Sequence, residues 1–438
     1  MAGEFTTYNV ERIGTFFRRQ TIVRNLDNAN VRGSVAIPLP LNWGDKIVKL
    51  TGKDVTTNSM YEKIGINQKS ESILPIILML QNCKDVYVYR SDKGGTKATT
   101  TIGASLVVTA KYTGLFGNNI TISVESLTEI NSFRVVTYVD GRVKDRQVVK
   151  KAQDLVANDY VVFEGTGVIT AVAGTSLSGG ANGTIITNYT EFLDGIKYLD
   201  LNVIAVLDNT QINSVVKFIE DIRKDFGKDF RAVVNNATVN NEYVIKLKDQ
   251  GFKTTDGDVI YGNLFTAYIS GLEAGSNGTV DNSYYAIPGA AELINPVDDV
   301  IEDINNGYYI LTTRADGAII VEEDVNSLMR ESGDKLTKTM QSNRNTRIII
   351  GLKNRFRDDF DKNVIGKIDG LDTGLDAIQT KTINILKEAE TNNEIKNFNP
   401  ETDVEVVFGD DDDTIIINAY VQTVKSIKKV YINLYQRV

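Results

Sequence analysis

The chain has 438 residues, a formal net charge of −9, one cysteine and no histidine. Without an imidazole, the sequence excludes a Ser-His-Asp triad, a Cys-His dyad and a zinc site completed by nitrogen ligands. The single cysteine, Cys83, allows no intramolecular disulfide, and the acidic balance argues against nucleic-acid binding, which is driven by neutralisation of phosphates. At roughly 100 to 200 residues per domain, this length predicts two to four domains.

No segment has the features of a secretion signal or a membrane span. The N-terminus lacks a basic stretch followed by an apolar one. The longest apolar run, residues 73–80, is far shorter than the ~18 residues that a membrane helix needs. We therefore expect a soluble intracellular protein.

The first 90 residues begin with a segment that shows little periodicity. Residues 1–21 are polar and aromatic, which favours an extended arm. Residues 33–40 alternate apolar with smaller side chains and end in prolines, which predicts a short strand. The apolar run 73–80 predicts a buried helix that leads into a strand at 86–89.

From residue 91 to residue 180 the chain is rich in Thr, Val and Gly. Its β-branched runs predict strands at 106–108, 120–124, 134–139, 160–163 and 168–172. Asp140-Gly141 and residues 165–167 break these runs as hairpin turns do. The flanking segments, 91–95 and 178–180, have the composition of flexible linkers. We interpret residues 91–180 as an inserted all-β domain.

From residue 190 the pattern changes to alternating helices and strands, which predicts βαβ units around a parallel sheet. Strands are predicted at 203–207, 230–234 and 259–261. Helices are predicted at 192–199, 215–226, 242–250, 264–272, 290–294 and 297–305. Residues 308–311 and 318–322 are predicted to pair as a hairpin.

Beyond residue 327 the chain becomes charged, with helices predicted at about 338–360 and 375–389. Strands are predicted at 404–408 and 414–424, joined across the aspartates 410–413. The final segment, 427–438, alternates two half-apolar faces and is predicted to be a strand. Such a terminal strand needs a partner sheet, in its own subunit or in another.

No motif predicts catalysis, a metal site or a cofactor. The contiguous aspartates 410–413 lack the alternation, central glycine and distal glutamate of a calcium loop, so a solvated hairpin turn fits better. Residues 369–376 fail the same test and are interpreted as a polar linker. Residues 165–167 lack the third glycine of a dinucleotide fingerprint. We predict no enzymatic activity, no metal and no cofactor.

Both ends of the chain are basic although the whole is acidic. The basic residues are Arg12, Arg18, Arg19 and Arg24 near the N-terminus, and Lys425, Lys428, Lys429 and Arg437 near the C-terminus. Basic ends on an acidic body suggest docking onto acidic surfaces of the same or a neighbouring subunit. Lysines that protect an edge strand from aggregation explain the C-terminal group equally well.

The chain as a whole resembles the contractile tail sheath family of myophages and phage-tail-like bacteriocins. The likeness is carried by the order and spacing of several passages rather than by one motif. These passages are residues 32–38 with 42–44, residues 112–120, residues 177–183, residues 270–275 with Ser270 in place of the usual alanine, residues 322–328, and residues 420–424 with 429–431.

The resemblance implies an α/β and β multidomain fold. It would have a subtilisin-like α/β core domain with an inserted all-β domain, an α+β C-terminal domain and extended terminal strand arms. The corresponding ranges are an N-terminal arm at 1–24, the core at 25–90 and 181–328, the β domain at 91–180, the C-terminal domain at 329–424 and a C-terminal arm at 425–438.

The resemblance also implies a structural function. The chain would polymerise in stacked rings around a tail tube and contract from a metastable extended state, driving the tube through the target cell envelope. Its partners would be copies of itself, the tail tube protein, and baseplate and tail terminator proteins, with no nucleic acid and only indirect contact with a membrane. It would assemble in the host cytoplasm and reside in the tail sheath of a virion or bacteriocin particle.

In this family the arms add strands to a sheet of neighbouring subunits. The candidate arm residues are Phe16, Phe17, Arg18, Arg19, Ile22, Lys428, Val430, Tyr431, Ile432, Leu434 and Tyr435. The candidate acceptor sheet contains Val404, Val406, Phe408, Ile415, Ile417, Ala419 and Val421. Candidates for contact with the tube are Arg344, Arg347, Lys353, Arg355, Lys381 and Lys387, although ordinary solvated helix faces explain these residues equally well.

Two alternative functions remain open from the sequence. One is a surface adhesin or decoration protein built on the β insertion. The other is a non-catalytic relic of a subtilisin-like peptidase, since the missing histidine opposes a working triad.

Overall fold

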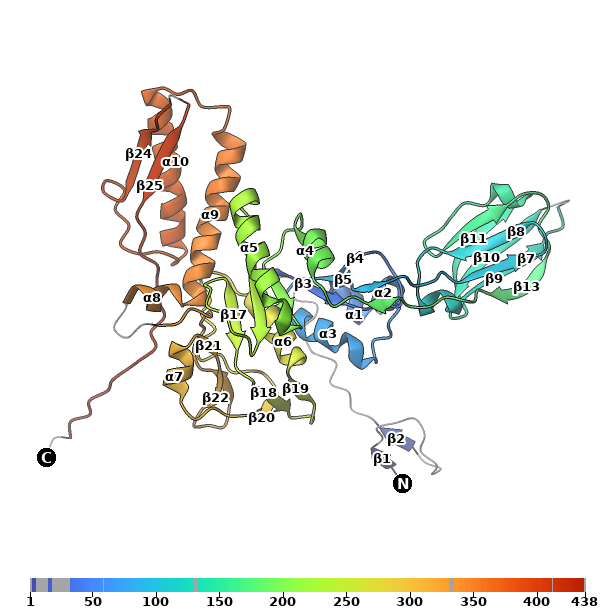
Figure 1. The fold of residues 1–438 in the computed structure, drawn as a ribbon, viewed down its shortest axis with the longest axis horizontal. Helices are drawn as coiled ribbons and strands as arrows, with labels where there is room; N and C mark the ends of the chain where they lie inside the picture. Colours follow the sequence, from blue (N-terminus) through green and yellow to red (C-terminus); the bar gives the residue numbers. More distant parts are fainter. Residues whose placement is uncertain are drawn as a thin grey trace.

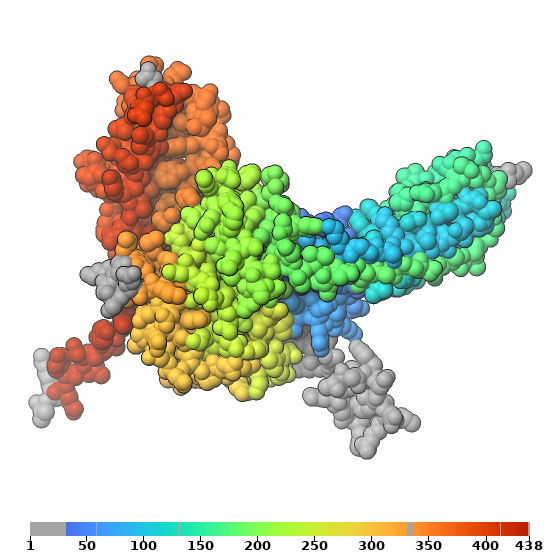
Figure 2. Space-filling view, viewed as in Figure 1, coloured from blue at the N-terminus to red at the C-terminus, as the bar shows by residue number. Residues whose placement is uncertain are grey.

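The computed structural model describes residues 2–4, 15–17, 32–57, 59–129, 132–330, 335–411 and 413–436. A mixed α/β body lies at the centre, a β-sandwich projects from one side, and a small α+β domain stands on another (Figure 1). The space-filling view shows that a narrow neck joins the sandwich to the body (Figure 2). Within the described residues, no helix combines the length and the apolar character that crossing a membrane requires.

The body is built on a seven-stranded sheet with the order β21-β17-β16-β15-β3-β5-β4. Neighbouring strands are parallel except for the antiparallel pair β4–β5. The strands are β3 (Ser34–Leu39), β4 (Ile47–Thr51), β5 (Asp85–Arg90), β15 (Val203–Val206), β16 (Arg231–Asn235), β17 (Val244–Leu247) and β21 (Tyr308–Tyr309). The inner strands are apolar on both faces, as expected for a parallel sheet covered on both sides.

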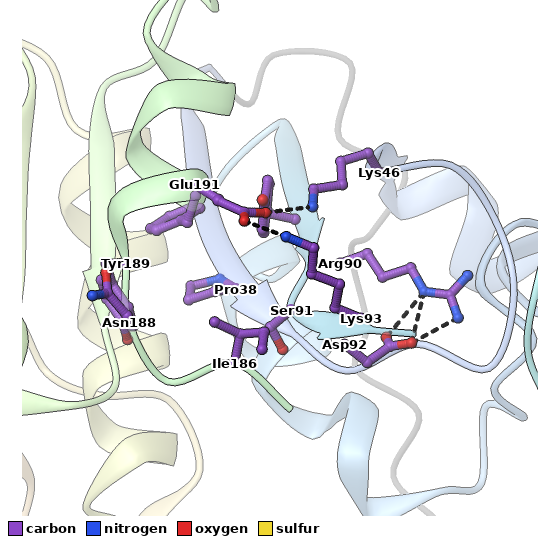
Figure 3. A pocket seen from close by; sticks show the side chains of 12 residues that line it. Pro38, Lys46, Arg90, Ser91, Asp92, Lys93, Ile186, Asn188, Tyr189 and Glu191 are labelled. Atoms are coloured by element: carbon purple, nitrogen blue, oxygen red, sulfur yellow. Dashed lines mark hydrogen bonds and ion pairs between the residues drawn. The ribbon is translucent and has the colours of Figure 1, made fainter. Parts of the chain in front are cut away.

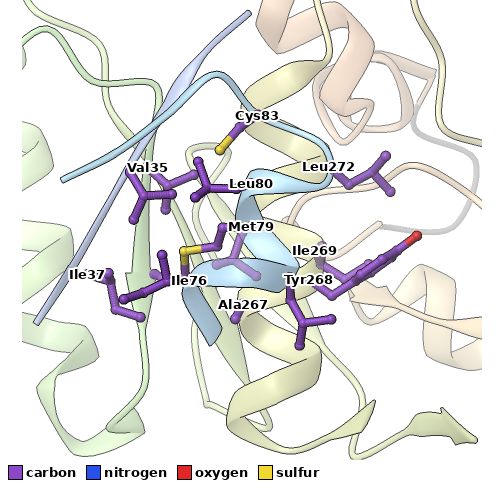
Figure 4. Packing of buried hydrophobic residues seen from close by; sticks show 14 of the residues in the cluster. Val35, Ile37, Ile76, Met79, Leu80, Cys83, Ala267, Tyr268, Ile269 and Leu272 are labelled. Atoms are coloured by element: carbon purple, nitrogen blue, oxygen red, sulfur yellow. The ribbon is translucent and has the colours of Figure 1, made fainter. Parts of the chain in front are cut away.

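Helices fill both faces of this sheet. Val35 and Ile37 of β3 face the core formed with α3 (Leu74–Leu80) and α6 (Asn263–Gly275). Ala36, between them, faces α4 (Thr190–Ile196) and α5 (Ile212–Phe226). Figure 4 shows how side chains of α3 and α6 pack together in the first of these cores.

Shorter elements complete the body. Helices α1 (Gly52–Thr56) and α2 (Ser59–Ile64) follow β4, and α7 (Val300–Asn305) precedes β21. Strands β18 (Gly251–Thr254), β19 (Val259–Tyr261) and β20 (Ala290–Ile294) form an antiparallel sheet, and β22 (Leu311–Thr313) pairs with β23 (Ile319–Val321).

The inserted domain is an antiparallel sandwich with one core. One sheet has the order β11-β10-β9-β13 and the other β12-β8-β7. The strands are β7 (Thr99–Ile102), β8 (Leu106–Ala110), β9 (Ile120–Ser126), β10 (Phe133–Val139), β11 (Arg142–Val149), β12 (Val161–Gly165) and β13 (Val172–Ser176). Strands β7 and β11 were not predicted, and the strand predicted at 168–172 lies instead at Val172–Ser176.

The C-terminal domain consists of α9 (Asn343–Asn363), α10 (Asp372–Thr391) and a hairpin of β24 (Val404–Phe408) and β25 (Ile415–Ala419). Short α8 (Lys335–Met340) precedes it. Helix α9 begins where the Ser342 hydroxyl accepts a hydrogen bond from the Asn345 amide. Its core joins Ile348 and Leu352 of α9 to Leu386 of α10 and Val404 of β24.

Two predicted helices were wrong. Residues 242–250 contain β17, in which all four side chains are buried in the sheet. Lys246 is tolerated there because its ammonium donates to the Asn306 carbonyl at 2.8 Å and lies 4.1 Å from the Tyr308 ring centroid. Residues 290–294 form β20, which pairs with β18. The predicted hairpin of 308–311 with 318–322 is only partly right, because Tyr308 and Tyr309 join the central sheet and only β22 pairs with β23.

The predicted flexible linkers at 91–95 and 178–180 were also wrong. Strand β6 (Asp92–Lys93) pairs with β14 (Thr184–Ile185), and isolated bridges join Thr96 to Ala181 and Thr99 to Ser178. Both segments therefore lie in a neck of paired backbone, which composition alone does not reveal.

Candidate functional site: the arm, the hairpin and the domain joint

The described part of the C-terminal arm, residues 425–436, leaves the body (Figure 1). Its apolar side chains are exposed. Leu434 is 92% exposed and Tyr435 is 88% exposed. The other exposed apolar residues of the arm are Ile427, Val430, Tyr431 and Ile432. In its described part, residues 425–436, the arm forms no strand with its own subunit. A contiguous apolar segment exposed in this way marks an interaction surface.

The hairpin of β24 and β25 contains most of the candidate acceptor residues. Val404 is opposite Ala419, Val406 opposite Ile417, and Phe408 opposite Ile415. One face of the hairpin packs on the helices through Val404 and Val406. Because these two strands form a sheet of their own among the described residues, each has one edge with no strand beside it. The strand predicted for 414–424 ends at Ala419, so Val421 lies beyond it.

The N-terminal arm is described only in part. Strand β1 (Ala2–Glu4) pairs in parallel with β2 (Thr15–Phe17), with Phe16 opposite Gly3 and Phe17 opposite Glu4. The candidates Arg18, Arg19 and Ile22 lie outside the described residues.

A buried charge network joins the body to the C-terminal domain. Arg347 of α9 donates to Glu273 of α6 at 2.6 Å and to Asp324, which follows β23, at 2.7 Å. Arg231 of β16 donates to the same Glu273 oxygen at 2.9 Å. The four side chains are between 0% and 4% exposed. We call this set of four residues the joint.

Amide groups complete the joint. Asn282 donates to the second Glu273 oxygen, and Asn343 donates to the second Asp324 oxygen. Arg347 also donates to the carbonyls of Asn277 and Val280. Both carboxylates are thereby paired and hydrogen-bonded, as buried charges must be if the fold is to tolerate them.

The pKa values of the two carboxylates in the joint are shifted in opposite directions. Burial by itself raises the pKa of Asp324, but the Arg347 guanidinium outweighs it and lowers that pKa to about 2. Burial and the neighbouring Asp324 carboxylate raise the pKa of Glu273, against the opposing effect of Arg347 and Arg231. Asp324 also accepts hydrogen bonds from the Asn282 amide and from the Asn343 side chain, and both lower its pKa further.

Two of the candidate tube contacts, Arg344 and Arg347, are buried where α9 meets the body. Arg344 and Arg347 are 8% and 6% exposed, and Arg344 donates to the Gly278 carbonyl at 3.0 Å. Their guanidinium groups are enclosed between the body and α9, so the structure removes both from the surface that a tube could touch.

The remaining candidates for tube contact are closer to solvent. Lys353 pairs with Asp229 of the body at 2.7 Å, Arg355 pairs with Glu394, and Lys381 pairs with Asp359 at 3.4 Å. Lys387 is exposed on α10. The six candidates were chosen from the sequence because they are basic. In the structure, some of them face the body and others face solvent.

Sequence reasoning missed the acidic half of the joint. Glu273 and Asp324 both lie within passages that carry the family resemblance, residues 270–275 and 322–328. In the second passage, the Ser327 hydroxyl also donates to the Asn241 carbonyl, and Asn326 donates to the Met340 carbonyl. Acidic and amide residues within otherwise apolar passages were the feature of the sequence that could have predicted a buried polar network.

The neck that carries the sandwich contains a second buried ion pair. Arg90, at the end of β5, donates to both carboxylate oxygens of Asp92, with side chains 7% and 2% exposed. Nearby, Glu191 of α4 accepts from Lys46 and Lys93 (Figure 3). The cavity among these residues encloses only about 10 Å³, which is room for one water molecule and not for a substrate.

Aromatic packing also fixes the neck. Trp43 of the body is 2% exposed and belongs to the sandwich core, with its ring centroid 4.9 Å from that of Phe116 and 5.1 Å from that of Tyr112. Tyr112 donates to Asp45 at 2.9 Å. The core of the sandwich therefore continues into the body.

Comparisons with known proteins agree with this architecture. Residues 93–182 match the phage tail sheath protein beta-sandwich domain, and residues 336–437 match the phage tail sheath C-terminal domain. The structure of a sheath tail protein from Desulfitobacterium hafniense is 30% identical, with a TM-score of 0.73, over 96% of this chain and 99% of that one. The chain belongs to the phage tail sheath protein family.

Other relatives of this tail sheath protein are similar over their whole length. A sheath tail protein from Listeria innocua is 29% identical with a TM-score of 0.82, over 91% of this chain and 93% of that one. The phage-like element PBSX protein XkdK of Bacillus subtilis is 27% identical over 99% of both chains. The family is one of structural proteins, not enzymes.

A more distant structure shares the fold alone. The helical sheath of the anti-feeding prophage in its contracted state is 10% identical with a TM-score of 0.53, over 99% of this chain and 100% of that one.

Proposed function

We propose that this tail sheath protein polymerises in stacked rings around a tail tube and contracts from a metastable extended state, driving the tube through a target cell envelope. The observation that carries the proposal is the C-terminal arm, whose alternating apolar residues are exposed in a chain that also presents a hairpin with unpaired edges among its described residues. Adding the arm to a neighbour's hairpin would bury the apolar side chains of the arm. It would also pair the free backbone groups at the edge of the hairpin.

The arms link subunits by strand addition in this proposal. Val430, Ile432 and Leu434 form one face of the C-terminal strand, and β24 and β25 form the acceptor. The N-terminal arm, residues 1–24, adds a second strand from another neighbour. The occurrence of this fold in the contracted helical sheath and in the baseplate of the anti-feeding prophage supports self-assembly and baseplate contact.

The domain ranges expected from the sequence are retained as part of this proposal, with a subtilisin-like core supported by the largely parallel sheet covered by helices on both faces. Contact with the tail tube is assigned to the candidate basic residues of the C-terminal domain that reach solvent, Lys353, Arg355, Lys381 and Lys387. The particle is a virion or a phage-like particle, with the chain in its tail sheath.

Deleting residues 427–438 tests the proposal. The truncated chain should fold, because the deleted segment contributes little to any core, but it should form no long tubes in negative-stain images. Normal tubes from the truncated chain would contradict the proposal.

A pair of single substitutions sharpens this test. Ile432→Asp places a charge on the predicted strand and should abolish tubes. Ile301→Asp is the matched control, because Ile301 is 73% exposed on α7 and Ile432 is 77% exposed. Loss of tubes in both variants would mean that exposed charge in general, and not the arm, governs assembly.

A further inference from the structure

The residues just before the C-terminal arm are fastened to their own subunit. Thr423 forms an isolated bridge with Ile395, and the Val424 amide donates to the Glu394 carbonyl at 2.9 Å. This is the last backbone hydrogen bond along the described chain. Residues 425–428, which follow, are here called the root of the arm.

Side chains alone hold the root. The Ser426 hydroxyl accepts from Arg344 at 2.8 Å, and Lys425 donates to the Thr339 hydroxyl at 2.7 Å. Lys428 then reaches Glu323 of the body, with its ammonium 2.8 Å from a carboxylate oxygen. The root therefore crosses from the C-terminal domain to the body before the arm becomes free.

The ion pair between Lys428 and Glu323 can break without leaving Glu323 unpaired. Arg330 also holds Glu323, at 3.2 Å, and the Glu323 side chain is 18% exposed. When Lys428 leaves, the carboxylate keeps a cation beside it, so no half-buried charge is left alone. Burial and the nearby ammonium groups of Lys338, Lys396 and Lys428 lower the pKa of Lys425, which shows that like charges crowd the root.

We propose that the root is a reserve of arm length, closed by the pair of Lys428 and Glu323 in the extended sheath and pulled open when the sheath contracts. This inference rests on the proposed function. If the exchanged strands stay paired while the subunit bodies move, the distance between Val424 and the exchanged strand changes. The chain between them must then lengthen or shorten to match that distance. Releasing residues 425–428 would add about 13 Å of extended chain to the free part of the arm, at roughly 3.3 Å per residue.

Reversible crosslinking tests the reserve in assembled particles. The variant Glu323→Cys/Lys428→Cys, in a Cys83→Ser background, is assembled into extended sheaths and treated with a bis-methanethiosulfonate crosslinker. A crosslinker is used because the contact is made at the tips of two long side chains, beyond the reach of a direct disulfide. We expect crosslinking within the subunit, sheaths that stay extended in denaturant, and contraction after dithiothreitol cleaves the link.

The matched control is Lys253→Cys/Glu292→Cys in the same background. These residues are direct neighbours on β18 and β20 and form an ion pair of the same length, 2.8 Å, away from the arm. Crosslinked control sheaths should contract at the same denaturant concentration as unmodified ones.

Two results would overturn the reserve. One is contraction of the crosslinked Glu323→Cys/Lys428→Cys sheath at the control's denaturant concentration. The other is failure of the two cysteines to crosslink in extended sheaths, which would mean that the root is already open. Either result can occur with normal tubes, whereas failure of the unmodified chain to form tubes would contradict the proposed function itself.

Removing the charge gives an independent readout. Lys428→Ala should lower the denaturant concentration at which half of the sheaths contract, while Lys253→Ala should not. Equal midpoints for Lys428→Ala and the unmodified sheath would contradict the proposal.

Discussion

Arg347 is the residue on which the connection between the body and the C-terminal domain depends most. It belongs to α9, yet its guanidinium contacts carboxylates from α6 and from the segment after β23. Because Glu273 and Asp324 are 0% exposed, water cannot replace Arg347 if it is lost. The joint therefore fixes how the two domains meet.

Replacing Arg347 should destabilise the unassembled subunit strongly. Arg347→Met leaves two carboxylates buried beside one remaining cation, and we expect a loss of about 3–5 kcal/mol in the free energy of unfolding. Guanidinium denaturation measures it. Lys217→Met, which removes the exposed pair with Asp221, should leave the midpoint almost unchanged. Equal effects of the two variants would show that the joint contributes no more to the free energy of unfolding than an exposed ion pair does.

Asp324 should give the subunit a specific acid sensitivity. Its pKa is lowered from 3.8 to about 2 in the folded chain, so its contribution is complete above about pH 4 and is lost as the pH falls towards 2. At 1.36 kcal/mol per unit, this contribution is ~2 kcal/mol. The free energy of unfolding of Asp324→Asn should lack this part of the pH dependence, and an unchanged slope between pH 4 and 2 would contradict the assignment.

At the scale of elements, the packing of α3 against α6 depends on glycines. A Cβ added at Gly271 of α6 would lie 2.5 Å from the Met79 carbonyl oxygen, and one at Gly275 would lie 1.8 Å from the Asn82 carbonyl oxygen. Both contacts are far inside van der Waals distance. The passage 270–275 therefore keeps glycines because the backbone of α3, and of the turn that follows it, passes directly over them.

Two glycine substitutions with opposite expected signs test this packing. Gly271→Ala should cost about 1–3 kcal/mol, because the neighbouring backbone has to move. Gly351→Ala, in α9, meets nothing within 4 Å and should stabilise the chain by about 0.5–1 kcal/mol through lower flexibility of the unfolded state. Thermal or chemical unfolding distinguishes them. If both variants were stabilised, the close approach of α3 to α6 would be wrong.

Elements with clear periodicity were predictable from the sequence, and those set by tertiary pairing were not. Helices α5, α9 and α10 lie where the apolar pattern predicts them. Strand β17 was mistaken for a helix because Lys246 interrupts an apolar strand, and only the fold supplies the carbonyl and the ring that accept it. Helical periodicity is a weak guide when a buried polar residue has a distant partner.

At the scale of the whole molecule, the sandwich is held firmly to the body. Trp43 extends the sandwich core into the body, and Arg90 pairs with Asp92 in a neck of paired strands. Arg90 also donates to the Thr113 carbonyl of the sandwich at 3.1 Å. We therefore expect the sandwich to move together with the body during any rearrangement of the sheath.

The ion pair in the neck gives this expectation a test. Arg90→Met leaves the nearly buried Asp92 carboxylate without its cation and should increase the rate of limited proteolysis at residues 91–95. Lys93→Met removes an exposed pair in the same neck and should change the rate little. Equal cleavage rates for Arg90→Met and the unmodified chain would show that the buried pair does not hold the neck.

The candidate site was predictable in outline because its signals are local. The alternating arm and the hairpin strands are visible in consecutive residues. The joint was not predictable, because Arg347 and Glu273 are 74 positions apart. Nothing in the sequence indicates which distant acidic residue pairs with a given arginine. For the same reason Arg344 and Arg347 were assigned to a surface, although the fold encloses them.

The central claim is that the C-terminal arm of one subunit completes the hairpin sheet of another. Electron cryo-microscopy of the assembled sheath tests it most directly. We predict that residues 430–435 form a strand hydrogen-bonded to the free edge of β24 or β25 of a neighbouring subunit. An arm that folds back on its own subunit, or that stays exposed in the assembled sheath, would contradict the account.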